Sequence, residues 1–155
     1  MRVVINNIKD TEKLGKIIAN VVEKGTVICL DGDLGVGKTA LTRFIGKELG
    51  VEEPIVSPTF TIIKEYQGRL PFYHMDVYRI PSEDSMYDLG YEEYIYSEGV
   101  TVIEWSKLIE GILPEERINI EIKRIDDEKR EINIDGKGHV YEKLAEELTN
   151  ENTVN

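Results

Sequence analysis

Residues 26–49 constrain the fold more than any other part of the chain. They begin with a continuous apolar run at 26–30, pass through a glycine-rich stretch at 32–39 and continue as a helical pattern over 40–49. An apolar run without alternation is typical of a strand covered on both faces, as in a parallel sheet. The order strand, glycine turn, helix therefore predicts an α/β fold.

The other segments repeat these patterns. Apolar residues recur at helical spacing over 14–22, after the good N-cap residues Asp10 and Thr11, and Gly25 is expected to end that helix. The predicted strands lie at 3–5, 59–66, 72–77, 100–104, 118–122 and 130–134. The last two are expected to form a hairpin around Asp126 and Asp127. A polar connection is predicted over 81–88, a short helix over 91–96 and a terminal helix over 139–148.

The glycine-rich stretch matches a phosphate-binding loop. Residues 32–39 read Gly-Asp-Leu-Gly-Val-Gly-Lys-Thr, which fits G-x-x-x-x-G-K-[ST] at every fixed position. Glycines let successive N–H groups point at phosphate, and the following helix adds its positive end. We expect Lys38 to neutralise phosphate charge and the Thr39 hydroxyl to bind magnesium. The residues predicted to contact the nucleotide here are Asp33, Leu34, Gly35, Val36, Gly37, Lys38, Thr39 and Ala40.

Together these features predict one domain over residues 1–148. Its sheet is expected to resemble that of P-loop nucleotide hydrolases: mostly parallel, with antiparallel edge strands and helices on both faces. Residues 149–155 are polar and are expected to fray.

Two acids are predicted to complete the site. Asp76 and Glu104 each end a predicted strand, and the carboxyl ends of parallel strands lie at the edge where the loop sits. Both are candidate magnesium ligands and catalytic acids, and the sequence leaves open which is the base. Ser57 and Thr59 lie between the loop helix and the Asp76 strand, where a hydroxyl could sense the γ-phosphate. Thr59 is therefore a third catalytic candidate, although Ser57-Pro58-Thr59 also suits a simple turn.

The composition narrows the class of protein. The net charge of −11 argues against a chain that grips nucleic acid alone, so a role on RNA would work through a partner or a small local patch. No apolar stretch is long enough for a bilayer, and the N-terminus does not read as a signal peptide, so we expect a cytoplasmic protein. Cys29 is the single cysteine and is expected to be a buried core thiol.

Four segments, in order and spacing, resemble the TsaE family, formerly called YjeE. They are the loop at 32–39, Ser-Pro-Thr-Phe-Thr at 57–61, His-Met-Asp-Val-Tyr-Arg at 74–79 and Ile-Glu-Trp-Ser at 103–106. The resemblance covers roughly residues 1–140. The loop is generic, whereas the second and third segments are much more specific to the family.

The resemblance implies a small ATPase that uses ATP and Mg²⁺. Its pathway places threonylcarbamoyl on N6 of adenosine 37 in tRNAs that read ANN codons. In the family, TsaD paired with TsaB performs the transfer, and the TsaE-like subunit binds that pair. Its ATP cycle supports repeated turnover, and it meets tRNA only indirectly.

The resemblance also assigns residues. It makes Lys38 and Thr39 the phosphate and magnesium ligands, Asp76 the Walker B-like acid and Glu104 the magnesium-site acid. It places Ser57 and Thr59 in the switch segment. It points to Asp10, Thr11 and Arg130 at the adenine end. Val36 replaces a common alanine and leaves the required glycines in place.

Two other enzyme classes use the same loop. A small-molecule kinase usually carries an arginine-rich lid, but Arg43, Arg69 and Arg79 are scattered. A GTPase usually reads guanine with N-K-x-D, and Asn7-Ile8-Lys9-Asp10 has the wrong spacing and precedes the loop. A purely structural module gives no reason for Lys38 and Thr39 together.

Overall fold

Seven strands form one sheet in the computed structural model of this chain, which describes residues 1–58 and 62–151. The elements in chain order are β1 (Arg2–Ile5), α1 (Ile8–Val21), β2 (Val27–Gly32), α2 (Lys38–Glu48), β3 (Ile63–Gln67), β4 (Pro71–Asp76), α3 (Asp84–Asp88), α4 (Tyr91–Ile95), β5 (Val100–Glu104), the 3₁₀ helix η1 (Ser106–Ile112), β6 (Arg117–Arg124), β7 (Arg130–Lys137) and α5 (His139–Asn150).

The sheet is parallel in its centre and antiparallel at both edges. Its strand order is β1-β7-β6-β2-β5-β4-β3. The three central pairings, β6 with β2, β2 with β5 and β5 with β4, are parallel, whereas the hairpins β3–β4 and β6–β7 and the edge strand β1 pair antiparallel. This arrangement confirms the predicted fold class and places β2, the strand before the glycine loop, in the interior of the sheet.

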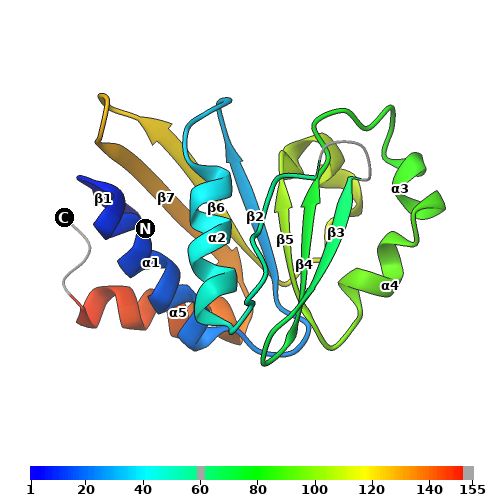
Figure 1. The fold of residues 1–155 in the computed structure, drawn as a ribbon, viewed down its shortest axis with the longest axis horizontal. Helices are drawn as coiled ribbons and strands as arrows, with labels where there is room; N and C mark the ends of the chain where they lie inside the picture. Colours follow the sequence, from blue (N-terminus) through cyan, green and yellow to red (C-terminus); the bar gives the residue numbers. More distant parts are fainter. Residues whose placement is uncertain (59–61, 152–155) are drawn as a thin grey trace.

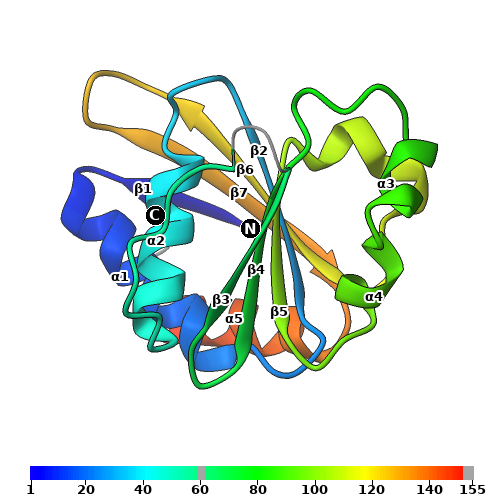
Figure 2. The same cartoon turned by 45° about the vertical axis from the view of Figure 1, so that its right-hand side comes forward.

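Helices cover both faces of the sheet, as predicted. Ile28 and Leu30 of β2 face a core shared with α1, α2 and α5, and the alternate residues Val27 and Cys29 face a second core shared with α3, α4 and η1. Figures 1 and 2 show α1, α2 and α5 gathered on one side and α3 and α4 on the other. Cys29 is fully buried, as expected, and its burial raises the pKa of the thiol to about 12.

The first helix begins earlier than predicted. Its N-cap is Asn7, whose Oδ1 accepts the Asp10 N–H at 3.1 Å, while Asp10 Oδ2 accepts the Asn6 N–H at 2.9 Å. The prediction that Asp10 and Thr11 cap this helix is therefore wrong, because the N-cap is Asn7 and the Asp10 carboxylate instead accepts the N–H of Asn6. The helix also ends at Val21, four residues before Gly25.

Other boundaries also differ. The predicted polar connection over 81–88 contains the short helix α3, and α5 continues to Asn150, so the first two residues of the expected frayed tail are helical. Part of the strand predicted over 59–66 falls on residues 59–61, outside the described residues. The described remainder begins β3 at Ile63. Among the described residues, no helix has the length and apolar character needed to cross a bilayer.

Candidate nucleotide-binding site

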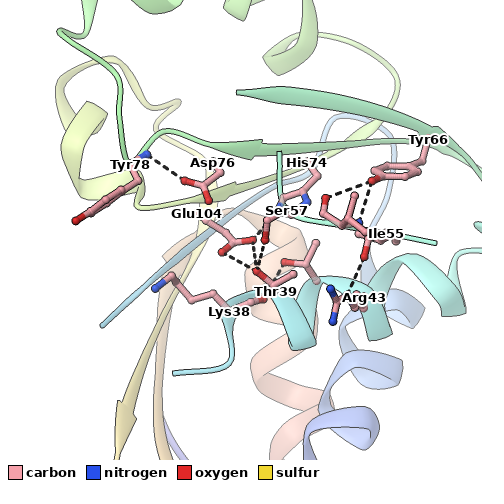
Figure 3. A network of polar contacts seen from close by, with 12 residues as sticks. Lys38, Thr39, Arg43, Ile55, Ser57, Tyr66, His74, Asp76, Tyr78 and Glu104 are labelled. Carbon is pink, nitrogen blue, oxygen red and sulfur yellow. Dashed lines mark hydrogen bonds and ion pairs between the residues drawn. The ribbon is translucent and has the colours of Figure 1, made fainter. Parts of the chain in front are cut away.

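A cavity of about 240 Å³ lies at the edge of the sheet where β2, β4 and β5 end. It is lined by Leu34, Gly35, Gly37, Lys38, Thr39, Ala40, Ser57, Asp76, Glu104 and Trp105. Figure 3 shows the side chains of Thr39, Ser57, Asp76 and Glu104 converging from different elements. The structure therefore brings together the loop, Ser57 and both strand-end acids that the sequence singled out.

Two positions of the loop require glycine, each for a different physical reason. A Cβ on Gly32 would lie 2.5 Å from the carbonyl oxygen of Ile122, so only glycine allows β2 and β6 to approach this closely. Gly37 has φ +118°, a conformation that side chains rarely adopt, and a Cβ there would meet no atom of the described residues within 4 Å. The first glycine preserves packing, and the second keeps open the space in front of α2.

The N-terminus of α2 faces this space. The N-cap is Gly37, which has no side chain to accept hydrogen bonds from the first turn. The free N–H groups of a helix start and the positive end of its dipole favour an anion. The loop and α2 together therefore suit a phosphate group.

Lys38 is held inside the loop. Its Nζ donates to the carbonyl oxygens of Gly32 at 2.5 Å and Asp33 at 3.0 Å, and lies 4.0 Å from the ring centroid of Trp105. Burial lowers the pKa of Lys38, and the carboxylates of Glu104 and Asp76 act in the opposite direction. The ammonium group is thus fixed beside the cavity rather than extended into solvent.

Thr39, Ser57 and Glu104 form an oxygen-rich cluster. Thr39 Oγ1 lies 3.0 Å from Ser57 Oγ and donates to the Glu104 carboxylate at 3.2 and 3.3 Å. Hydroxyl and carboxylate oxygens are the ligands Mg²⁺ prefers, and Mg²⁺ usually needs only one or two carboxylates when phosphates complete its shell. Among residues 1–58 and 62–151, no group of three or more His, Cys, Asp or Glu side chains could hold a metal without such help. The donor set fits magnesium bound together with a nucleotide.

Asp76 stands beside this cluster in a different environment. It is the register partner of Glu104 on the adjacent parallel strand, and its Oδ1 accepts the N–H of Tyr78 at 3.1 Å. Burial raises the pKa of Asp76, the Tyr78 hydrogen bond lowers it, and the neighbouring Glu104 carboxylate raises it further. The two acids therefore share a cavity but differ in partners, because only Glu104 contacts Thr39.

His74 is the residue of this site that sequence reasoning missed. In the sequence it stands out only as part of the His-Met-Asp-Val-Tyr-Arg segment at 74–79. In the structure it is fully buried, and its Nε2 contacts Oε2 of Glu104. Its position two residues before Asp76 places both on one face of β4 and was the available signal.

The corner after β5 places Trp105 against the loop. Trp105 has φ +64°, and its backbone N–H donates to the carbonyl of Leu30 at 2.9 Å. Asp31 secures the next turn by accepting the Ser106 hydroxyl at 2.5 Å and the Lys107 N–H at 3.0 Å. The Trp105 ring both packs against the second core and lines the cavity.

A second cavity, of about 260 Å³, adjoins the first across Gly35, Gly37 and Ala40. Its lining includes Thr11 and Arg130, two of the three residues predicted at the adenine end. Arg130 Nε donates to the carbonyl of Val36 at 2.9 Å, which ties the β6–β7 hairpin to the loop. Asp10 does not line this cavity; its carboxylate accepts the N–H of Asn6 at the start of α1.

The remaining predicted residue, Thr59, lies outside the described residues. Its neighbour in the same segment, Ser57, is placed in the first cavity and contacts Thr39. The hydroxyl that the structure locates beside Thr39 is therefore that of Ser57.

Comparison with known proteins adds independent information. The model of the family described as "Threonylcarbamoyl adenosine biosynthesis protein TsaE" matches residues 5–132. A Bacillus subtilis (strain 168) protein named tRNA threonylcarbamoyladenosine biosynthesis protein TsaE is 47% identical over 149 residues, or 96% of this chain and 93% of that protein. A protein of the same name from Treponema pallidum (strain Nichols) is 40% identical over 134 residues, or 86% and 99%. The crystal structure of Bacillus subtilis YdiB is similar with a TM-score of 0.80 and 42% identity, covering 98% of this chain and 95% of that one.

Proposed function

The chain belongs to the TsaE family, and we propose that it is the ATP-binding and ATP-hydrolysing subunit required to form threonylcarbamoyladenosine in tRNA. One observation carries the hydrolytic part of this proposal. Thr39, Ser57, Asp76 and Glu104, which come from four separate segments, meet in one cavity beside the phosphate loop. A site that only bound phosphate would need the loop and α2, but not two carboxylates at adjacent strand ends.

In this proposal the loop holds the triphosphate. Lys38 and the first N–H groups of α2 neutralise the phosphates, and Thr39 and Glu104 hold magnesium. Bound magnesium supplies charge neutralisation at the β- and γ-phosphate oxygens. The base of the nucleotide occupies the second cavity, between Thr11 and Arg130.

Asp76 is then the acid that orients water. Its carboxylate lines the same cavity as Lys38 and Thr39 and is not engaged by Thr39. The water oxygen forms a bond to the γ-phosphorus, the bond to the bridging oxygen of ADP breaks, and Asp76 accepts the water proton. A raised pKa suits a carboxylate to this task, because it makes the group a stronger base than a solvated aspartate.

The phosphate cavity argues against a kinase. Of the arginines considered for a lid, Arg43 donates to the carbonyl of Ile55 at 2.7 Å and Arg69 to that of Ala19 at 2.6 Å. No arginine within the described residues lines the first cavity. The guanidinium groups of Arg43 and Arg69 are both bonded to backbone carbonyls, so transfer of the phosphoryl group to water is favoured over its transfer to a metabolite.

The proposed partners are TsaD and TsaB, with tRNA met indirectly through them. The net charge of −11 supports this division, because the chain has no excess of positive charge for holding RNA alone. This role places the protein in the cytoplasm and makes the transfer of the threonylcarbamoyl group the work of the partner pair.

The decisive experiment measures phosphate release from ATP and GTP by the purified chain, with and without the TsaB–TsaD pair. We expect slow Mg²⁺-dependent release from ATP, stimulated by the pair, and loss of release in Thr39→Ala, Asp76→Ala and Glu104→Ala. Unchanged ATP turnover in all three variants would overturn the assignment of these residues to the hydrolytic site. Phosphate appearing on a metabolite would replace hydrolysis with a kinase activity, and a strong preference for GTP would exclude the ATPase.

A further inference from the structure

The buried pair formed by His74 and Glu104 has a role that the phosphate loop does not explain. His74 is 0% exposed and Glu104 is 2% exposed, and the His74 Nε2 contacts Glu104 Oε2. We propose that His74 is a positioning residue, which orients the Glu104 carboxylate toward Thr39 so that both can hold magnesium. This inference rests on the proposed function, because it assigns a partner to one of its metal ligands.

The donor and acceptor properties of the two side chains determine which of them donates the hydrogen bond. A carboxylate only accepts hydrogen bonds, so the His74 Nε2 carries the proton and donates it to Glu104. The other ring nitrogen, Nδ1, is buried and has no hydrogen-bond partner among residues 1–58 and 62–151. Placing an N–H on Nε2 satisfies the contact with Glu104, and it leaves at Nδ1 an acceptor, which is found without a partner more often than a buried N–H is.

The sheet holds the imidazole in place. His74 is the register partner of Val102 on β5, and Glu104 follows Val102 on the same face, so the contact runs diagonally between neighbouring strands. On its own strand His74 lies between Phe72 and Asp76, which share its face. Phe72 and Val102 are both fully buried in the core that α2 covers. The ring therefore has a rigid support on its apolar sides.

The contact with His74 restricts the orientation of the Glu104 carboxylate. Its Oε2 is shared between the His74 Nε2 and the Thr39 hydroxyl, and its Oε1 also lies within reach of that hydroxyl. The His74 N–H limits rotation of the carboxylate about its terminal bond. Groups that orient a metal-binding side chain typically contribute a factor of about 10 to 100 in metal affinity.

Two amide variants separate hydrogen bonding from packing. His74→Gln can place an N–H where Nε2 lies, whereas His74→Asn places its amide nearer to Nδ1, away from Glu104. Metal affinity is measured with Mn²⁺ by electron paramagnetic resonance, in the presence of a non-hydrolysable ATP analogue. We expect Mn²⁺ to bind His74→Asn about tenfold or more weakly, and His74→Gln within about threefold of the unmodified chain. Affinity for ADP in EDTA should be unchanged in both variants.

Each outcome decides the inference. Unweakened Mn²⁺ binding by a folded His74→Asn protein overturns it, as does equal weakening in the Gln and Asn variants, which would indicate packing alone. If thermal unfolding shows that His74→Asn does not fold, His74→Phe keeps a ring without the donor and is judged by the same criterion. An unmodified chain that binds Mn²⁺ and the analogue but never hydrolyses ATP would overturn the proposed hydrolysis and leave the role of His74 intact.

Discussion

Asp76 and Glu104 are directly opposed in the register of β4 and β5, as the last residues of two adjacent parallel strands. Their chemical surroundings nevertheless differ. Glu104 contacts Thr39 and His74, whereas Asp76 accepts the N–H of Tyr78. Two carboxylates at one level of a sheet can therefore take separate roles, one beside the proposed metal and the other beside the proposed water.

The first prediction concerns Asp76 and pH. Burial raises the pKa of Asp76 above its ordinary value of 3.8, so the folded chain binds this proton more readily than the unfolded chain. The stability that protonated Asp76 contributes to the fold is therefore lost as the pH rises above 3.8 and through the raised pKa. At neutral pH the buried, ionised carboxylate still lowers the free energy of unfolding. Asp76→Asn should raise Tm at pH 7 and lower ATP hydrolysis on the order of a hundredfold.

Thermal unfolding and phosphate release test both parts of this prediction. The matched control is Asp84→Asn, an exposed aspartate of α3 outside the cavity, which should change neither. The acid side of the pH–rate profile should lie above pH 3.8, and a lower Tm for Asp76→Asn at pH 7 would contradict the burial argument.

The second prediction separates two threonines of α2. Thr39→Val removes the hydroxyl that contacts Ser57 and Glu104 and should reduce Mg²⁺-dependent hydrolysis on the order of a hundredfold. Thr42 lies one turn later, and its hydroxyl donates to the carbonyl of Lys38 at 2.9 Å. Thr42→Val should keep its activity. Hydrolysis measured across a Mg²⁺ titration decides the matter, and equal losses in the two variants would remove Thr39 from the metal site.

The third prediction contrasts two glycines. Gly32→Ala places a Cβ 2.5 Å from the Ile122 carbonyl oxygen and should destabilise the fold by about 2 kcal/mol, lowering Tm by roughly 4–8 °C. Gly37→Ala meets no atom of residues 1–58 and 62–151 within 4 Å, but it suffers backbone strain of about 1–2 kcal/mol and intrudes on the phosphate space. We expect it to weaken ATP binding roughly tenfold, or about 1.4 kcal/mol.

Calorimetric titration with ATP and thermal unfolding measure the two effects side by side. Full ATP affinity in a folded Gly37→Ala protein would show that the phosphates do not approach this position.

The fourth prediction concerns the link between the hairpin and the loop. Arg130→Met removes the donor to the Val36 carbonyl, a charged hydrogen bond of about 1.5–3 kcal/mol, and should weaken ATP binding about tenfold. Arg124 lies on the same hairpin, but among the described residues its guanidinium group hydrogen-bonds to Asp126 and Asp127 rather than to the loop. Arg124→Met is therefore the matched control, with unchanged affinity expected. Similar ATP affinities for the two variants in equilibrium binding would rule out a role for the link.

Much of the site was predictable because its chemistry is local. The glycine spacing, the apolar run before it and the helix after it lie within 24 consecutive residues, so their backbone conformations follow from neighbouring residues alone. Asp76 and Glu104 were predictable for a related reason: each ends an apolar strand, and parallel strands end at one edge. Their pairing in register confirms that argument.

The contacts that adjust this site arise from residues far apart in the chain. His74 meets Glu104 across 30 positions, and Ser106 meets Asp31 across 75. No periodicity in the sequence encodes such pairs, because they depend on which strands become neighbours and in which register. The capping of α1 by Asn7 was missed for a smaller reason, since several polar residues there compete for one role.

The loop with its helix, the alternation of strands and helices and the strand-end acids thus follow from local pattern, because backbone geometry and burial period are properties of short segments. The strand order, the partner of each acid and the cavity shared by Lys38, Thr39, Ser57, Asp76 and Glu104 follow from packing. Packing joins segments that a linear pattern leaves independent, and it alone gives two similar carboxylates different surroundings.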